Sequence, residues 1–292
     1  MVNILWFSLI LLAIWFSVVL VRDLWLHRRE LKGPFWTSGL IGFVVNFFDV
    51  LGIGAFAPQT ALLRFTKQTA DRVMPGTLNV ANTLPVLIQA IIFIRVIEVE
   101  PVTLVTMLLS SALGAVFGAR IVSRLSENRI RLVMGIALLV TAGFMIINGL
   151  QGINGSGTAI GLTGWRLVIA IAVNAILGAL MTAGIGLYAP CMALVFLLGL
   201  SPKVAFPIMM GSCAFLMPPA STTFIKKGAY DRKAAIAMAI PGMIAVPIAA
   251  FLVKSLPLNT LRVLVVLVIL YTAASMLSAF AKGRREKAIP AS

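Results

Sequence analysis

The stretch NFFDVLGIGAFAP, residues 46–58, places one aspartate and two glycines in an otherwise apolar run that a proline closes. Glycine allows positive φ and a close approach of the backbone, whereas proline cannot continue the interior of a hydrogen-bonded helix. The stretch therefore predicts a broken helix at Gly52, Gly54 and Pro58. The meaning of that break depends on the medium that surrounds it.

The composition indicates that this medium is a lipid bilayer. Of the 292 residues, 60% are hydrophobic and only 11% are charged, whereas a soluble domain carries about 25% charged residues. Several apolar runs approach or exceed the ~18–20 residues that cross a bilayer. The first of them, residues 4–21, lacks the basic start and the cleavage site of a signal peptide, so we expect it to be retained. We predict an all-α polytopic membrane protein.

The distribution of positive charge predicts an orientation. The net charge is +15, and the basic residues gather in five clusters, at 22–32, 64–72, 119–131, 226–233 and 282–287. Three connections are poor in them: 97–100, 151–164 and 254–260. Under the positive-inside rule the clusters are cytoplasmic, which puts the N-terminus outside and the C-terminus in the cytoplasm. Anionic lipid at the cytoplasmic face is a sufficient partner for this charge, and nucleic acid is not needed.

The chain also repeats itself. GIGAFAP (52–58) matches GIGLYAP (184–190) at an offset of 132 residues, and at the same offset Met74-Pro75 falls on Phe206-Pro207. Because glycines and prolines recur at near-constant spacing, we interpret the pattern as a duplication. The expected parts are an N-terminal transmembrane helix with a basic cytoplasmic loop at 1–35, repeat 1 at 36–149, an external linker at 150–164, repeat 2 at 165–280 and a basic cytoplasmic tail at 281–292.

The charges predict that the two repeats run in opposite directions through the membrane. An inverted-topology repeat of this kind occurs in many secondary transporters. Each glycine-broken region, about 36–65 and 165–200, must then return to the side from which it entered. We expect two re-entrant or hairpin helix pairs, although two pairs of fully spanning helices would preserve the same parity.

A broken helix in hydrocarbon leaves backbone groups unpaired unless protein or a wet cavity receives them. Half-helices that begin near Ala57–Pro58 and Ala189–Pro190 would point free N–H groups and positive dipole ends into such a cavity, which suits an anion. Tight helix packing is the structural alternative for these glycines. Neutral polar groups at helical spacing on the following helices, Gln89 and Cys213 among them, would complete the site. The candidate substrate-binding residues are Gly52, Gly54, Pro58, Thr77, Asn79, Asn82, Gly184, Gly186, Tyr188, Pro190, Gly211 and Ser212.

Asp49 is the one acidic residue inside an apolar span, where a charge costs at least ~2.5–3.5 kcal/mol. The functional interpretation is a proton-coupling carboxylate beside the anion site. The structural interpretation is an acid that hydrogen-bonds the broken backbone of its own hairpin, with Asn46 as a partner. Cys191, next to Pro190, is more typical of a small apolar filler than of a group that meets the substrate.

The duplicated Gly-x-Gly near a proline, GARIVSRL (118–125) after an apolar helix, and LRVLVVLVILYTAASML (261–277) resemble the TauE/SafE family of sulfite exporters. The resemblance covers nearly all of the chain after residue 36. It implies transport of small sulfur-containing anions such as sulfite, sulfoacetate or thiosulfate across the bacterial inner membrane. The family commonly shows Gly-x-Gly-Gly-Gly at the first repeat, whereas Ala55 and Phe56 follow Gly54 here, which is typical of a divergent subgroup.

We therefore expect a carrier that moves a small anion by alternating access, with proton coupling through Asp49 as an option. An anion channel and a cation/proton antiporter that uses Asp49 remain alternatives. An intramembrane enzyme is disfavoured, because the sequence has no HExxH motif, no aspartate dyad and no Ser–His pairing. With two cysteines and one histidine, we expect neither a disulfide framework, nor a metal site, nor a cofactor. The sequence leaves a homodimer open.

Overall fold

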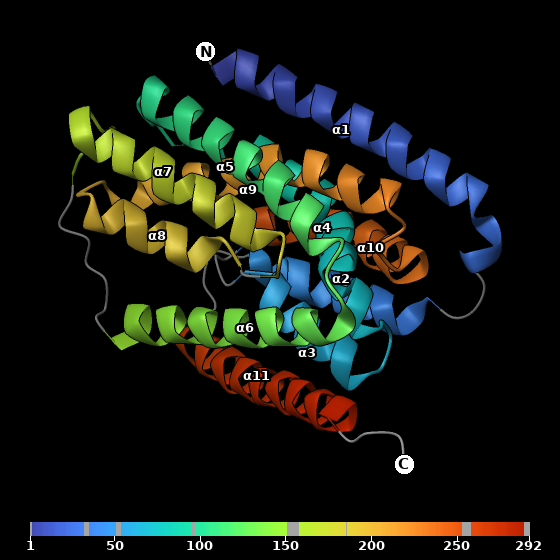
Figure 1. The fold of residues 1–292 in the computed structure, drawn as a ribbon. Coiled ribbons are helices and arrows are strands. Elements are labelled where there is room, and N and C mark those ends of the chain that lie inside the picture. The colour runs from blue at the N-terminus through green and yellow to red at the C-terminus, as the bar shows by residue number, and fades with distance from the viewer. Residues whose placement is uncertain are drawn as a thin grey trace.

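The computed structural model describes residues 2–31, 35–50, 54–94, 97–150, 158–184, 186–252 and 258–288 (Figure 1). All regular structure in these ranges is helical, as the sequence predicts for an all-α protein. The α-helices are α1 (Val2–Leu26), α2 (Trp36–Asp49), α3 (Phe56–Phe65), α4 (Met74–Phe93), α5 (Pro101–Val122), α6 (Glu127–Leu150), α7 (Gly164–Met181), α8 (Tyr188–Leu197), α9 (Pro202–Lys226), α10 (Arg232–Leu252) and α11 (Leu258–Ala288). Two 3₁₀ helices, η1 (Arg28–Leu31) and η2 (Asp71–Val73), complete the list.

Six of the described helices are long and apolar enough to cross a membrane: α1, α4, α5, α7, α9 and α10. The other two expected spans, 131–149 and 262–280, lie inside α6 and α11. Helices α3 and α8 have 10 residues each. At 1.5 Å per residue they are about 15 Å long, half of the ~30 Å hydrocarbon thickness. Neither of these two can span a bilayer.

The bundle has α4 and α9 at its centre and α1 at its edge. Of the spans themselves, 83% of α9 and 72% of α4 are buried, against 22% of α1. Helix α5 packs on α7 and α9, helix α10 packs on α2 and α4, and α6 packs on α11. Figure 1 shows α1 along one edge of the bundle and the α6–α11 pair along the opposite edge. The helices before residue 150 are thus packed largely against helices after residue 164.

Small residues allow these helices to approach one another closely. A methyl group at Gly114 of α5 would overlap the backbone of Ala175 in α7, and one at Gly178 of α7 would overlap the backbone of Ser111 in α5. Gly42 of α2 lies in the same way against the backbone of Met238 in α10. Since apolar side chains gain little by leaving lipid, close backbone packing of this kind is a main source of association between membrane helices.

Polar contacts at the helix ends hold the bundle together. Arg232, at the start of α10, binds Asp23 of α1 (Nε–Oδ2 2.8 Å) and Glu30 of η1 (Nη1–Oε2 2.7 Å). At the start of α5, the Glu100 carboxylate accepts hydrogen bonds from the N–H of Val102 (2.9 Å) and from the N–H and hydroxyl of Thr103 (2.7 Å each). These contacts fix α1 against α10 and cap α5.

Candidate functional site

Each half of the chain contains one broken pair of helices. In the first, α2 ends at Asp49 and α3 begins at Phe56. In the second, α7 ends at Met181 and α8 begins at Tyr188. Glycine is required in both connections, because Gly54 has φ +89° and Gly184 has φ +101°, values that L side chains rarely adopt. Gly52, also expected in the site, lies outside the described residues.

The two breaks meet at one small cavity. Its volume is about 20 Å³, room for about one water molecule. Five residues expected from the sequence line it, together with six apolar or thiol side chains. The lining residues are Asp49, Gly54, Ala55, Phe56, Asn82, Val86, Met181, Gly186, Leu187, Tyr188 and Cys213. Because Phe56 and Tyr188 are the first residues of α3 and α8, the N-termini of both short helices face this cavity.

Asp49 is buried and hydrogen-bonded to the central helix α4. Its Oδ2 atom accepts a hydrogen bond from Nε2 of Gln89 at 2.7 Å. Gln89 in turn accepts one on Oε1 from the hydroxyl of Tyr188, also at 2.7 Å. Asn46, the partner that the sequence suggested, instead donates to the carbonyl of Gly42 within its own helix (2.8 Å). The carboxylate is therefore joined to the second broken pair through Gln89, and the Tyr188 hydroxyl also lies near the carboxylate itself.

Asn82 forms a second polar pair beside the same cavity. Its Oδ1 accepts a hydrogen bond from Nε2 of Gln59 in α3 (2.9 Å), and its Nδ2 donates both to Oε1 of Gln59 (2.5 Å) and to the carbonyl of Leu78 (2.8 Å). Both amides are fully buried. The pair fixes the short helix α3 to α4 at the edge of the cavity.

The cavity suits an anion through neutral groups. Among the described residues that line it none is a lysine or an arginine, and the one acidic residue is Asp49. The first N–H groups of a helix have no intrahelical partners, and the helix dipole adds a partial positive charge at that end. Two such ends face the cavity, at Phe56 and Tyr188. Neutral donors of this kind can bind a small oxyanion and still release it.

The chain matches the family model described as sulfite exporter TauE/SafE over residues 3–145 and 166–291. It belongs to the TauE/SafE family. Membership makes it a multi-pass membrane transporter of sulfite or related small anions. A search of the curated proteins finds no match, and neither does a search of the solved structures.

In this TauE/SafE protein, several of the expected site residues lie away from the cavity. Thr77 donates to the carbonyl of Val73 (2.8 Å) and accepts the N–H of Asp231 (2.9 Å), so it joins α4 to the α9–α10 turn. Asn79 donates to the carbonyl of Pro75 (2.8 Å), one turn back in α4. Neither residue lines the cavity.

The remaining expected residues, two prolines and two residues of α9, are not among the described residues that line the cavity either. Pro58 and Pro190 are the third residues of α3 and α8, where a missing N–H costs no hydrogen bond. Gly211 lies against Leu108 of α5. The Ser212 hydroxyl accepts a hydrogen bond from Nδ2 of Asn174 at 3.0 Å. Gly211 and Ser212 therefore serve the packing of α9 on α5 and α7.

Two polar residues at the site, Gln89 and Cys213, follow the helix-breaking prolines as the sequence suggested, but they were not among the candidate substrate-binding residues. Gln89 lies seven residues after Asn82, on the same face of α4, and this helical spacing groups it with Asn82 in the sequence. Cys213 of α9 lines the cavity beside Tyr188, and its sulfur contacts that of Met181 at 3.6 Å. The presence of a thiol in an apolar helix is weaker evidence for a site than the spacing of Gln89, because buried cysteines are common packing residues.

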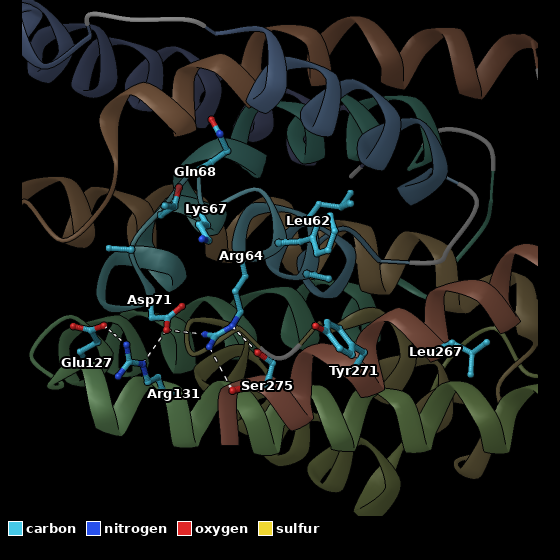
Figure 2. Close-up of a pocket in the computed structure, with 14 residues that line it drawn as sticks. Leu62, Arg64, Lys67, Gln68, Asp71, Glu127, Arg131, Leu267, Tyr271 and Ser275 are labelled. Carbon is cyan, nitrogen blue, oxygen red and sulfur yellow. Dashed lines mark hydrogen bonds and ion pairs between the residues drawn. The ribbon is translucent and has the colours of Figure 1, made fainter. Parts of the chain in front are cut away.

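A larger cavity of about 1050 Å³ lies between α3, η2, α6 and α11 (Figure 2). In it, Oδ2 of Asp71 binds Nη1 of Arg64 at 2.7 Å and Nε of Arg131 at 2.9 Å, and Arg131 also binds Glu127 at 2.6 Å. Figure 2 shows the Arg64 side chain reaching from α3 towards Asp71 and Ser275. Arg64 donates to the hydroxyl (3.3 Å) and carbonyl (3.4 Å) of Ser275 in α11. This ion-pair network joins α3 to the α6–α11 pair.

Proposed function

We propose that this protein is a secondary transporter that moves a small sulfur-containing anion across the inner membrane by alternating access. Sulfite, thiosulfate, sulfoacetate and related organosulfonates are the candidate substrates. The observation that carries the proposal is the shared cavity, because Gly54 and Gly186, one from each glycine motif, line it together with Asp49, Asn82 and Tyr188. An anion binding there would meet two helix N-termini and neutral donors.

The packing of the helices supports an inverted repeat. Helix α5 lies on α7 and α9, and its counterpart in the other half, α10, lies on α2 and α4. The pairs α2–α3 and α7–α8, α4 and α9, and α6 and α11 correspond in the same order. Two halves that exchange equivalent contacts around one site are the usual architecture of alternating-access carriers.

The volume of the cavity fits a transport cycle rather than an open pore. A sulfonate or thiosulfate ion is several times larger than the water molecule for which about 20 Å³ has room. Substrate entry therefore requires α3 or α8 to move relative to α4 and α9. The contacts that would have to change are the Gln59–Asn82 and Gln89–Tyr188 hydrogen bonds.

Counterflow in proteoliposomes tests the transport mode. Vesicles preloaded with unlabelled thiosulfate should accelerate the uptake of labelled thiosulfate, since a carrier exchanges substrate faster than it returns empty. Large single-channel currents without counterflow would establish the channel alternative. Sodium or potassium exchange for protons, unaffected by sulfur anions and abolished in Asp49→Asn, would establish the antiporter alternative.

A thermal-shift series on purified protein tests the substrate class. Sulfite, thiosulfate, sulfoacetate and taurine should raise the melting temperature more than acetate or succinate does. Stabilisation by the carboxylates alone would contradict the sulfur assignment and leave the transporter fold intact. Chloride at matched ionic strength serves as the control for nonspecific salt effects.

A further inference from the structure

Gln89 lies between two groups that exchange hydrogen-bonding roles when a proton binds. Its Nε2 donates to Asp49 at the end of α2, and its Oε1 accepts from Tyr188 at the start of α8, each at 2.7 Å. The exposed fractions of Asp49, Gln89 and Tyr188 are 1%, 0% and 5%, so bulk water does not compete for these bonds. An ionised carboxylate only accepts hydrogen bonds. The amide must therefore turn its NH₂ to Asp49, and the phenol must donate to the amide oxygen.

Protonation of Asp49 reverses this requirement. A proton on Oδ2 makes that atom a donor, and the amide of Gln89 can meet it only by presenting Oε1 instead. The Ala55 N–H and the Tyr188 hydroxyl also lie near the carboxyl group as donors, so the Gln89 amide oxygen is the acceptor that a proton on the carboxyl group would meet. Once the amide has turned over, its NH₂ faces the oxygen of Tyr188. The phenol hydrogen then needs another acceptor, and Tyr188 lines the cavity.

We propose that Gln89 couples proton binding at Asp49 to anion binding, because only the protonated state frees the Tyr188 hydroxyl to donate a hydrogen bond to an anion in the cavity. This inference rests on the proposed transport of a small anion. Gln89 is a positioning residue in this scheme, and Tyr188 is the group that touches the substrate. A hydronium ion that reaches the cavity transfers the proton, so one of its O–H bonds breaks as the O–H bond on Asp49 forms and a water molecule is left.

Charge acts in the same direction as the hydrogen bonds. Asp49 itself lines the cavity, so its ionised form repels an anion there, and protonation removes the repulsion. By linkage, proton binding strengthens anion binding, and bound anion raises the proton affinity of the site to the same extent. Proton and anion therefore occupy the carrier together and move in the same direction, as symport.

No other charged group competes for this role in the described part of the molecule. The described helices around Asp49 and its cavity are α2, α3, α4, α7, α8, α9 and α10, and their basic side chains lie at helix ends, away from the cavity: Arg64, Arg166, Lys203, Lys226, Arg232 and Lys233. The remaining titratable groups nearby are the phenol of Tyr188 and the buried thiols of Cys213 and Cys191. The Asp49 carboxyl group is thus the one charged group among the described residues that line the cavity.

Thiosulfate binding measured by calorimetry at about pH 6 and pH 8 tests the proposal, since thiosulfate itself does not titrate in this range. Wild-type protein should bind about tenfold more tightly at the lower pH, the effect of one hydrogen bond to a charged ligand. Asp49→Asn should remove the pH dependence. Tyr188→Phe should bind at pH 6 several-fold more weakly than wild type, whereas the same change at the exposed Tyr271 should have no effect.

The variant Gln89→Met separates the hydrogen-bond relay from Asp49 through Gln89 to Tyr188 from the repulsion of the anion by ionised Asp49. This variant keeps the carboxylate but has no amide, so it should retain a reduced pH dependence while melting as a folded protein. Binding of thiosulfate that is equally tight at both pH values in wild type, or a Tyr188→Phe variant with the wild-type pH profile, would overturn the relay and leave anion transport standing. Failure of sulfite, thiosulfate and sulfoacetate to bind at either pH would overturn the proposed function itself.

Discussion

Gln59 and Asn82 face each other across the contact between α3 and α4 and exchange two side-chain hydrogen bonds, at 2.9 and 2.5 Å. Both amides are fully buried, and Asn82 also lines the small cavity. The same pair of residues therefore contributes to stability and to the proposed anion site. These two contributions can be separated by mutation.

Asn82→Leu should lower the free energy of unfolding by about 1–3 kcal/mol, because it leaves the buried amide of Gln59 without a partner. The double variant Gln59→Met/Asn82→Leu should recover part of that loss, since neither polar group is then left unpaired. Both variants should bind the anion more weakly than wild type does, because both lack the Asn82 amide. Thermal unfolding in detergent and thiosulfate calorimetry measure the two effects, and full recovery of binding in the double variant would exclude Asn82 from the site.

Asp71→Asn should destabilise the contact of α3 with the α6–α11 pair. The change leaves Arg64 and Arg131, which are 18% and 27% exposed, without their shared carboxylate, and partial solvent access reduces the cost to about 1–3 kcal/mol. The matched control is Glu127→Gln, because Glu127 binds Arg131 but is 46% exposed. An Asp71→Asn melting temperature equal to that of wild type would show that the network contributes little.

Gly114→Ala should destabilise the bundle by about 1–3 kcal/mol, the usual cost of overpacking. The added methyl group would overlap the backbone of Ala175, which cannot move without shifting α7. Gly143→Ala in α6 is the control, since no described atom lies within 4 Å of its added methyl group. Comparison of thermal unfolding in the same detergent tests this, and a stable Gly114→Ala variant would mean that α5 and α7 separate easily.

The cap of α5 predicts a pH dependence of stability. Hydrogen bonds from the Thr103 hydroxyl and from the N–H groups of Thr103 and Val102 hold the pKa of Glu100 below its ordinary value of 4.5, against the opposing effect of partial burial. A carboxyl group with a lowered folded-state pKa stabilises the protein above the unfolded pKa, and this contribution is lost as the pH falls through the folded pKa. Wild type should therefore melt above Glu100→Gln at neutral pH, and the difference should shrink as the pH falls below 4.5 and through the lowered folded-state pKa of Glu100.

Melting temperatures of both proteins across this range provide the measurement. Glu98→Gln, an exposed change on the same connection, controls for the loss of one negative charge. A constant difference between wild type and Glu100→Gln down to the lowest pH would contradict the role of the ionised carboxylate in the cap.

The sequence predicted the features that depend on local backbone chemistry. Gly54 and Gly184 adopt the positive φ for which glycine was expected, and α3 and α8 begin just before the prolines that were expected to stop helix continuation. The helical fold and the family also followed from composition and motif. These properties are encoded in short stretches, so a single sequence is sufficient to reveal them.

Which polar side chains face the cavity could not be predicted from short stretches of sequence. Thr77 and Asn79 both follow the Pro75-Gly76 break, yet each hydrogen-bonds the carbonyl four residues back in its own helix, a local alternative that helical spacing does not exclude. Asn46, the expected partner of Asp49, also hydrogen-bonds the carbonyl four residues back in its own helix. Asp49 instead accepts a hydrogen bond from Gln89, which lies in a different helix. Which side chain faces a neighbouring helix depends on helix rotation and packing.

The exchange of packing partners between the halves has a consequence for biosynthesis. When the ribosome has completed residue 150, helices α2, α4 and α5 have already been inserted, but α10, α7 and α9, against which they pack, have not yet been made. The early helices are therefore in the bilayer before their packing partners have been synthesised, and Asp49 and the polar face of α4 then lack their final neighbours. Maturation of this protein is therefore expected to depend on insertion machinery that shelters incomplete chains until the last helix arrives.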